Sequence, residues 1–153
     1  MTKASEEKES TVVLASGVFD LVHYGHVYFL QEAKKAGGEN TRLVVVVARD
    51  KTVERLKGKP PVLPEEQRRA IVEALKPVDE AVLGREDFSI KEILREIKPD
   101  VVAVGYDQTD IEENVRRLIS EEGLRIKVVR IGRFAPTGLE SSSRIKRKIS
   151  GQG

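Results

Sequence analysis

The chain has no cysteine among its 153 residues and no hydrophobic run of membrane-spanning length. Without a thiol, disulfides, thiolate zinc sites and cysteine nucleophiles are excluded. A transmembrane helix needs about 20 mostly apolar residues. The first ten residues, Met1 to Ser10, are polar and charged and lack the apolar core of a signal peptide. We therefore expect a cytoplasmic protein with no membrane partner.

A large charge of one sign is also missing. Although 34% of the residues are charged, the formal net charge is only +2, so bulk electrostatics gives no case for a nucleic-acid partner. The length suits one domain that buries its core without cross-links. We expect residues 1–10 to be a disordered lead-in and residues 11–153 to form that domain.

Apolar, β-branched stretches alternate with segments whose apolar residues recur at helical spacing. Strands are predicted at 12–15, 43–48, 78–83, 101–104 and 125–131. Helices are predicted from Val27 to the glycines at 37–38, from Pro64 through Leu75, at 90–97, from Asp110 to Gly123, and from the serines at 141–143 to Ile149. The helix that starts at Pro64 has an apolar face of Ile71, Val72, Ala74 and Leu75. Asp87 or Ser89 is predicted to cap the helix at 90–97, and Asp110 the helix that follows it. The stretch 49–61 is predicted to be a basic, proline-bearing loop.

This alternation predicts one open, parallel, three-layer α/β domain with helices on both faces of a five-stranded sheet. In such sheets, ligands bind at the carboxyl ends of the strands where the strand order reverses. If the order is 3-2-1-4-5, the loops after the first and fourth strands meet at one crevice.

Both histidines of the chain lie between the first strand and the first helix, in the stretch from Gly17 to His26. A helix N-terminus carries free N–H groups and about half a positive charge, which favours phosphate. Gly17 and Gly25 allow the backbone to approach a ligand closely. The rings of His23 and His26 offer N–H donors to oxygens that gain charge during phosphoryl transfer. The alternative, a helix-entry loop with surface or capping histidines, explains one histidine better than two.

Other polar residues at the same edge of the predicted sheet are candidates, each with an ordinary alternative. Asp20 could align a histidine, cap the helix or help to hold a metal. Lys57 and Lys59 lie on the loop that leaves the second strand, where phosphate binding is favoured over solvated charge. Asp107 follows the fourth strand and either lies near a nucleotide or stabilises a turn.

Three serines, Ser141 to Ser143, precede the basic last helix. Their hydroxyls and the helix start suit a triphosphate, and the alternative is an N-cap with spare serines.

The stretch G-V-F-D-L-V-H-Y-G-H resembles the G-x-F-D-x-x-H-x-G-H signature of the cytidylyltransferase-like nucleotidyltransferases. In that family, the two histidines contact nucleotide phosphates and stabilise the transition state at the α-phosphorus. The resemblance implies a Rossmann-like domain in which His23 and His26 are catalytic. It also implies that Gly17, Val18, Phe19 and Gly25 bind the nucleotide.

The similarity covers nearly the whole chain after the first ten residues and implies further roles. Relatives place a loop lysine against the triphosphate, so we predict that Lys59 is catalytic and that Lys57 contacts the acceptor phosphate, although one sequence does not decide between them. Arg68, in an E-x-R pattern, is implied to clamp the phosphate of the nucleophile, and a surface helix arginine is the alternative. Asp107 matches a G-x-D segment near the nucleotide, and the three serines match a segment that holds the β- and γ-phosphates.

Within this family, segments 47–53, 64–69 and 74–79 resemble archaeal FAD synthases, which are FMN adenylyltransferases. Glycerol-3-phosphate cytidylyltransferases more often have a tryptophan where this chain has Gln108, and a different segment where it has Phe134 and Pro136. The resemblance therefore implies that a phosphate oxygen of FMN attacks the α-phosphorus of ATP and expels pyrophosphate. We expect the loop after the fourth strand and residues 132–139 to select the base.

The partners implied are ATP and FMN, with Mg²⁺ or another divalent cation whose protein ligands are unknown. Relatives are often dimers, which favours a homodimer. Two alternatives stay open: cytidylyl transfer from CTP to glycerol 3-phosphate or a similar phosphoalcohol, and a nucleotide-binding regulatory module without turnover.

Overall fold

The computed structural model describes residues 10–87 and 89–133. Several predictions therefore lie outside the described residues: the lead-in at 1–9, Phe134, Ser141, Ser142, Ser143 and the last helix. In the described part, the strands form one parallel sheet in the order β3-β2-β1-β4-β5, which confirms the predicted strand order. None of its helices has the length and apolar character needed to cross a membrane.

The strands are β1 (Thr11–Gly17), β2 (Thr41–Val47), β3 (Glu80–Leu83), β4 (Val101–Gly105) and β5 (Lys127–Ile131). The helices are α2 (Tyr24–Lys35), α3 (Asp50–Lys57), α4 (Glu65–Glu73), α5 (Ile90–Ile97) and α6 (Thr109–Glu122).

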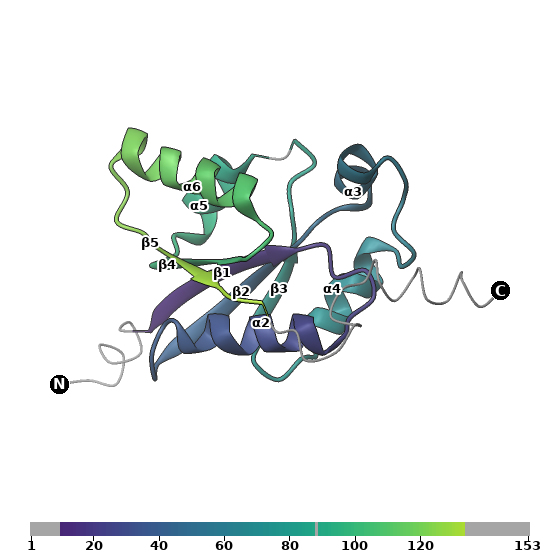
Figure 1. The fold of residues 1–153 in the computed structure, drawn as a ribbon, viewed down its shortest axis with the longest axis horizontal. Coiled ribbons are helices and arrows are strands. Elements are labelled where there is room, and N and C mark those ends of the chain that lie inside the picture. The colour runs from purple at the N-terminus through teal and green to yellow at the C-terminus, as the bar shows by residue number, and fades with distance from the viewer. Residues whose placement is uncertain (1–9, 88, 134–153) are drawn as a thin grey trace.

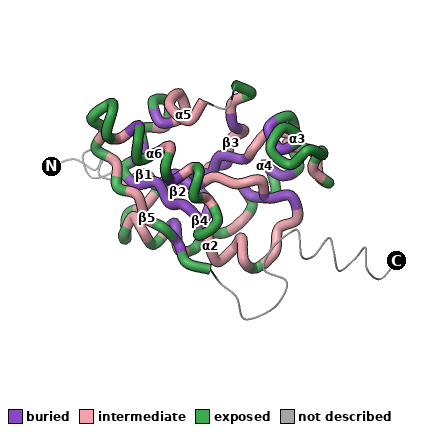
Figure 2. The backbone as a smooth tube through the Cα atoms, turned by 45° about the horizontal axis from the view of Figure 1, so that its top comes forward, coloured by how far each residue is buried: buried purple, intermediate pink, exposed green. Residues whose placement is uncertain are grey.

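Helices cover both faces of the sheet: α2 and α4 lie on one face, and α5 and α6 lie on the other (Figure 1). Alternate residues of the strands supply two separate cores. Val13 and Ala15 of β1 belong to the core beneath α2 and α4, whereas Leu14 belongs to the core beneath α5 and α6. Strands buried on both faces are nearly continuous apolar runs, and the tube in Figure 2 is accordingly buried along the central strands.

Helix α3 corrects the prediction of a loop over 49–61. Asp50 occupies its first turn, Thr52 and Val53 are buried on its inner side, and Gly58 ends it in the left-handed conformation with φ of 77°. Such a glycine is a common helix terminator. The helix is short and mostly polar, so its apolar spacing was too weak to be recognised beside the prolines.

The buried face of α4 also differs from the prediction. Ile71 is 39% exposed and Ala74 is exposed, whereas Val72 and Arg68 are buried. The buried positions follow the i, i+4 spacing of one helix face, and a charged residue occupies one of them.

The predicted caps are partly right. Ser89 begins α5, and its hydroxyl accepts the N–H of Glu92. Helix α6 begins after Gln108, so Asp110 lies inside its first turn rather than at its N-cap. Gly123 ends α6 as predicted, with φ of 65°.

Candidate active site

The two histidines cap the N-terminus of α2 reciprocally. The N–H of Gly25 donates to Nδ1 of His23 at 3.0 Å, and the N–H of His23 donates to Nδ1 of His26 at 3.2 Å. This arrangement corresponds to a capping box, with imidazole nitrogens in place of the usual oxygens. Because each Nδ1 is an acceptor, each neutral ring carries its proton on Nε2. The capping alternative and the phosphate hypothesis are therefore compatible, since one nitrogen of each ring caps the helix and the other carries a donor.

The two rings lie against each other, with centroids 4.0 Å apart and planes inclined by 35°. Burial, the neighbouring His23 and then Lys57 lower the pKa of His26 from 6.5 to about 4. His26 is therefore a neutral hydrogen-bond donor at physiological pH. A neutral donor suits an oxygen that gains charge, because it needs no proton transfer to act.

The turn before the histidines depends on Gly17. Phe19 has a left-handed backbone, with φ of 53°, and its buried ring folds back over Gly17. A Cβ on Gly17 would lie 2.8 Å from Cε2 of Phe19. The same ring lies 5.4 Å from the ring of His26, measured between centroids. Gly17 thus makes room for a ring that supports the second histidine.

Asp20 anchors a distant loop. Its buried carboxylate accepts the N–H groups of Val62 and Leu63, each at 2.8 Å. These bonds join the histidine turn to the segment that follows α3 and carries Lys59. Loop anchoring was not among the roles predicted for Asp20.

Arg68 joins three loops from the inside. The side chain is 0% exposed. Its Nε donates to the carbonyl of Leu63, Nη1 donates to the carbonyls of Val18 and Ala48, and Nη2 donates to Asp50, all at 2.6 to 2.8 Å. Both predictions for Arg68 are corrected: it is not a surface arginine, and a direct clamp on a phosphate does not fit a guanidinium whose donors are used in this way.

The structure separates the two candidate lysines. Lys57, the last residue of α3, lines the same cavity as His23 and His26, and its charge contributes to the low pKa of His26. Lys59 is exposed in the following loop and is not part of the cavity lining. Lys57 is therefore the lysine that the fold brings to the histidines, and the catalytic role of Lys59 stays a prediction.

The loop after β4 reaches the same cavity, as the strand order predicts. Asp107 lines the cavity and is exposed. The amide of Gln108 is already used by the fold, because its Nε2 donates to the carbonyl of Ser16 at 2.9 Å and its Oε1 accepts the N–H of Gly105 at 2.8 Å. Gln108 therefore connects β1 with β4, which was not expected of a residue considered for base selection.

Arg49 and Thr52 are site residues that the sequence reasoning missed. Both line the cavity from the carboxyl end of β2 and the start of α3. Nε of Arg49 donates to the carbonyl of Gly84 at 2.7 Å, and its Nη1 lies 3.3 Å from the carboxylate of Glu65. The position of Arg49 just after a buried parallel strand was an available signal.

These residues surround one cavity of about 430 Å³, a size typical of small-molecule sites. It begins at the histidine turn and extends along the face of the sheet that carries α5 and α6. Within residues 10–87 and 89–133, no three histidine, aspartate or glutamate side chains gather as ligands for a metal.

Comparison with known proteins identifies the family to which the chain belongs. The model of the cytidylyltransferase-like family matches residues 14–148. The FAD synthase of Methanopyrus kandleri is 51% identical over 138 residues, which cover 90% of each chain. The FAD synthase of Ferroglobus placidus is 52% identical over 138 residues, which cover 90% of this chain and 86% of the relative.

Solved structures have the same fold. A crystal structure described as the lipopolysaccharide core biosynthesis protein of Thermoplasma volcanium superposes with a TM-score of 0.73 at 42% identity, over 81% of this chain and 98% of the other. Pantothenate synthetase of Thermus thermophilus has a TM-score of 0.56 at 16% identity, over 99% of this chain and 75% of the other, and this likeness concerns the fold alone. Together with the paired histidines and the 3-2-1-4-5 sheet, these matches establish that the chain belongs to the cytidylyltransferase-like family of nucleotidyltransferases.

Proposed function

We propose that the protein is an FMN adenylyltransferase, an FAD synthase that transfers AMP from ATP to FMN and releases pyrophosphate. The observation that carries the transferase chemistry is the pair of histidines at the N-terminus of α2, joined in one cavity by Lys57. The choice of ATP and FMN is supported by relatives named FAD synthase that are about half identical over most of this chain.

The reaction is a single in-line displacement. An oxygen of the FMN phosphate forms a bond to the α-phosphorus of ATP while the bond from that phosphorus to the bridging oxygen breaks, and the electron pair leaves with pyrophosphate. The attacking phosphate is already ionised, so no general base is required. Catalysis then consists of positioning and of stabilising the charge that develops on the phosphoryl oxygens.

The residues around the cavity divide this work. The Nε2–H groups of His23 and His26 donate to the α-phosphate at the positive end of the α2 dipole, because the N–H groups of His23 and Gly25 already donate to the Nδ1 atoms of the two rings. Lys57 supplies positive charge beside them, and its proximity to His26 supports this placement. Ser141 to Ser143 remain the proposed partners of the β- and γ-phosphates, and Phe134 of the base.

The divalent cation enters with the substrate in this proposal. The described residues form no cluster of three or more metal-binding side chains. Mg²⁺ is commonly held by substrate phosphates with only one or two carboxylates from the protein. Such a cation would neutralise charge on the triphosphate, and the exposed carboxylate of Asp107, which lines the cavity, is a candidate for contact with its water shell.

The decisive measurement is kcat/KM for ATP and CTP, each with FMN and with glycerol 3-phosphate, under one metal condition. We expect ATP with FMN to be at least 10-fold better than CTP with glycerol 3-phosphate, because one or two unpaired polar groups at a mismatched base supply that difference. A higher value for CTP with glycerol 3-phosphate would replace the proposed activity with cytidylyl transfer. Absence of pyrophosphate release from every pair would favour the regulatory module. The homodimer and the cytoplasmic location stay predictions.

A further inference from the structure

The cavity has a second part, which leads away from the histidines toward β2 and β3. We call this part the apolar slot; it is lined by Val46 of β2, Gly84 after β3, Thr52 and Leu56 of α3, and Ile90 and Ile93 of α5. Arg49 and Arg85 line the same end of the cavity. Val46, Ile90 and Ile93 also belong to the core beneath α5 and α6. The slot is therefore an opening at the edge of that core, continuous with the phosphate site.

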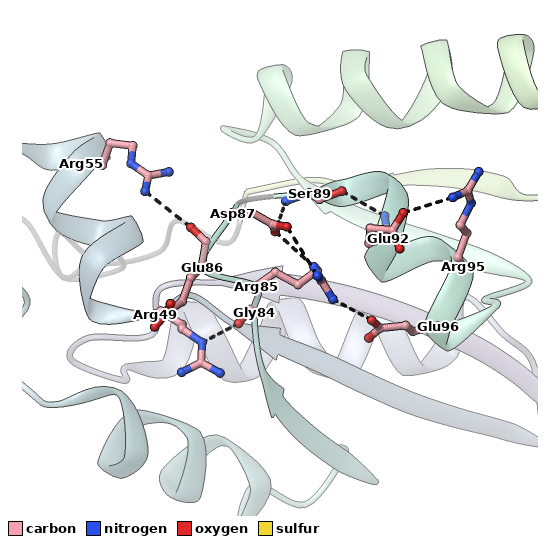
Figure 3. A network of polar contacts seen from close by, with 10 residues as sticks. All are labelled: Arg49, Arg55, Gly84, Arg85, Glu86, Asp87, Ser89, Glu92, Arg95 and Glu96. Carbon is pink, nitrogen blue, oxygen red and sulfur yellow. Dashed lines mark hydrogen bonds and ion pairs between the residues drawn. The ribbon is translucent and has the colours of Figure 1, made fainter.

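Both sides of the slot are held by the segment that connects β3 with α5 (Figure 3). On the side of α3, Arg49 donates to the carbonyl of Gly84 at 2.7 Å, and Arg55 donates to the carbonyl of Glu86 at 3.5 Å. On the side of α5, Nη1 of Arg85 donates to Glu96 at 2.8 Å. These bonds place the slot in its open shape before a ligand arrives, which reduces the ordering cost of binding.

Gly84 leaves space in the slot because it has no side chain. A Cβ at position 84 would lie 3.3 Å from Cγ1 of Val46, which faces the slot, and 3.6 Å from the carbonyl oxygen of Val47. A side chain here would therefore project over Val46 and occupy space that a ligand needs.

One polar atom in the slot has no hydrogen-bond partner among the described residues. Thr52 is 2% exposed, and its Oγ1 is buried and unpaired. A helical threonine usually satisfies its hydroxyl at the carbonyl four residues earlier. That carbonyl belongs to Ala48, and it accepts Nη1 of Arg68. A buried hydroxyl without a partner is costly, so the structure presents a group suited to a ligand.

We propose that the apolar slot binds the flat ring system of the acceptor, the isoalloxazine of FMN, and that Oγ1 of Thr52 forms a hydrogen bond with the polar edge of that ring. The assignment rests on the proposed function. Arg49 and Arg85 are bonded to protein groups, and the other walls are apolar with one hydroxyl. Such walls match a ring whose faces and one end are apolar and whose other end carries carbonyl and imide groups. The slot lies on the β2–β3 side of the histidines. Asp107, which is predicted to lie near the nucleotide, follows β4 on the other side. The two substrates would then meet at the histidine turn from opposite sides.

The test uses Thr52→Val, which removes the hydroxyl at nearly constant shape, and Thr52→Ser, which keeps it. Riboflavin and FMN binding are followed by flavin fluorescence, and ATP binding by calorimetry. We expect Thr52→Val to raise the Kd of both flavins about 3- to 10-fold, the range of one neutral hydrogen bond, with an unchanged Kd for ATP. Thr52→Ser should stay within about twofold of wild type for all three ligands. Because the hydroxyl has no partner among residues 10–87 and 89–133, Thr52→Val should not lower Tm.

Thr41→Val is a matched control. Thr41 lies at the amino end of β2, far from the slot along that strand, and its Oγ1 donates to the carbonyl of Gly38 at 2.8 Å. This variant should lower Tm and leave both flavin affinities unchanged. Gly84→Ala provides a second route to the same conclusion, because its methyl group should weaken flavin binding and leave ATP binding unchanged.

The outcomes separate this inference from the proposed function. Unchanged flavin affinity in both Thr52→Val and Gly84→Ala would overturn the slot assignment, even if the wild-type protein makes FAD. A loss of ATP affinity without a loss of flavin affinity would overturn it as well, by giving the slot to the nucleotide. Conversely, flavin binding that depends on Thr52 in a protein that makes no FAD would support the slot and reject the proposed activity. A wild-type protein that neither binds flavin nor makes FAD would reject both.

Discussion

Acidification should destabilise this protein through His26. Its pKa is lowered from 6.5 to about 4 by burial, by His23 and by Lys57. Between these two values the unfolded chain binds a proton that the folded protein does not accept, so the free energy of unfolding falls as the pH decreases from about 6.5 to about 4. Above about pH 7.5 this residue is neutral in both states, and its contribution no longer changes.

The magnitude follows from the two pKa values. At 1.36 kcal/mol per pKa unit, the difference between 6.5 and about 4 corresponds to about 3 kcal/mol at full protonation of the unfolded state. Small domains have about 5–15 kcal/mol of net stability. The titration of one ring should therefore remove a substantial fraction of the total.

Urea unfolding at several pH values between 7.5 and 4 measures this effect, with His26→Gln as the reference. Glutamine does not titrate in this range and is one of the usual residues at this position of a capping box, so it can accept the N–H of His23 in place of Nδ1. Carboxylates that titrate in the same range affect both proteins alike. We expect the wild-type protein to lose about 3 kcal/mol more than His26→Gln between pH 7 and pH 4.

A parallel pH dependence in the two proteins would refute the reasoning, because His26 would then not be kept neutral by its surroundings. NMR titration of the two histidine rings gives an independent reading. Replacing Lys57 with methionine should raise the pKa of His26, since the lysine charge is one cause of its low value.

Two further predictions concern catalysis and loop architecture. Alanine at His23 or His26 should reduce kcat by about 10²- to 10³-fold with a smaller change in nucleotide affinity, and near-normal turnover by a folded double mutant would remove the histidines from the mechanism. Arg68→Met should lower the free energy of unfolding by about 3–5 kcal/mol, because it leaves three carbonyls and a carboxylate without their donor. Arg68→Lys should recover little of this stability, because one ammonium group cannot make the several hydrogen bonds that the planar guanidinium makes. Unchanged stability of Arg68→Met with a raised KM for FMN would instead restore the predicted phosphate clamp.

The amino-acid sequence by itself determined the sheet and the location of the phosphate turn. Buried parallel strands are apolar on both faces, so their runs stand out in the sequence, and the alternation with helices leaves few topologies to consider. The histidine turn was recognisable because its glycines, its histidines and the helix that they cap are neighbours along the chain. Local chemistry is sufficient for such a motif.

The tertiary structure decided the roles of residues whose partners are distant in sequence. Arg68 donates to carbonyls as far away as Val18, and the amide of Gln108 bonds to Ser16, 92 residues earlier. In the sequence, both residues lie within motifs that suggested contact with a substrate. Lys57 rather than Lys59 faces the histidines because α3 forms and ends at Gly58. The sequence around Thr52 gives no signal of function. Its buried hydroxyl has no partner among the described residues, and the carbonyl four residues earlier accepts Arg68 instead.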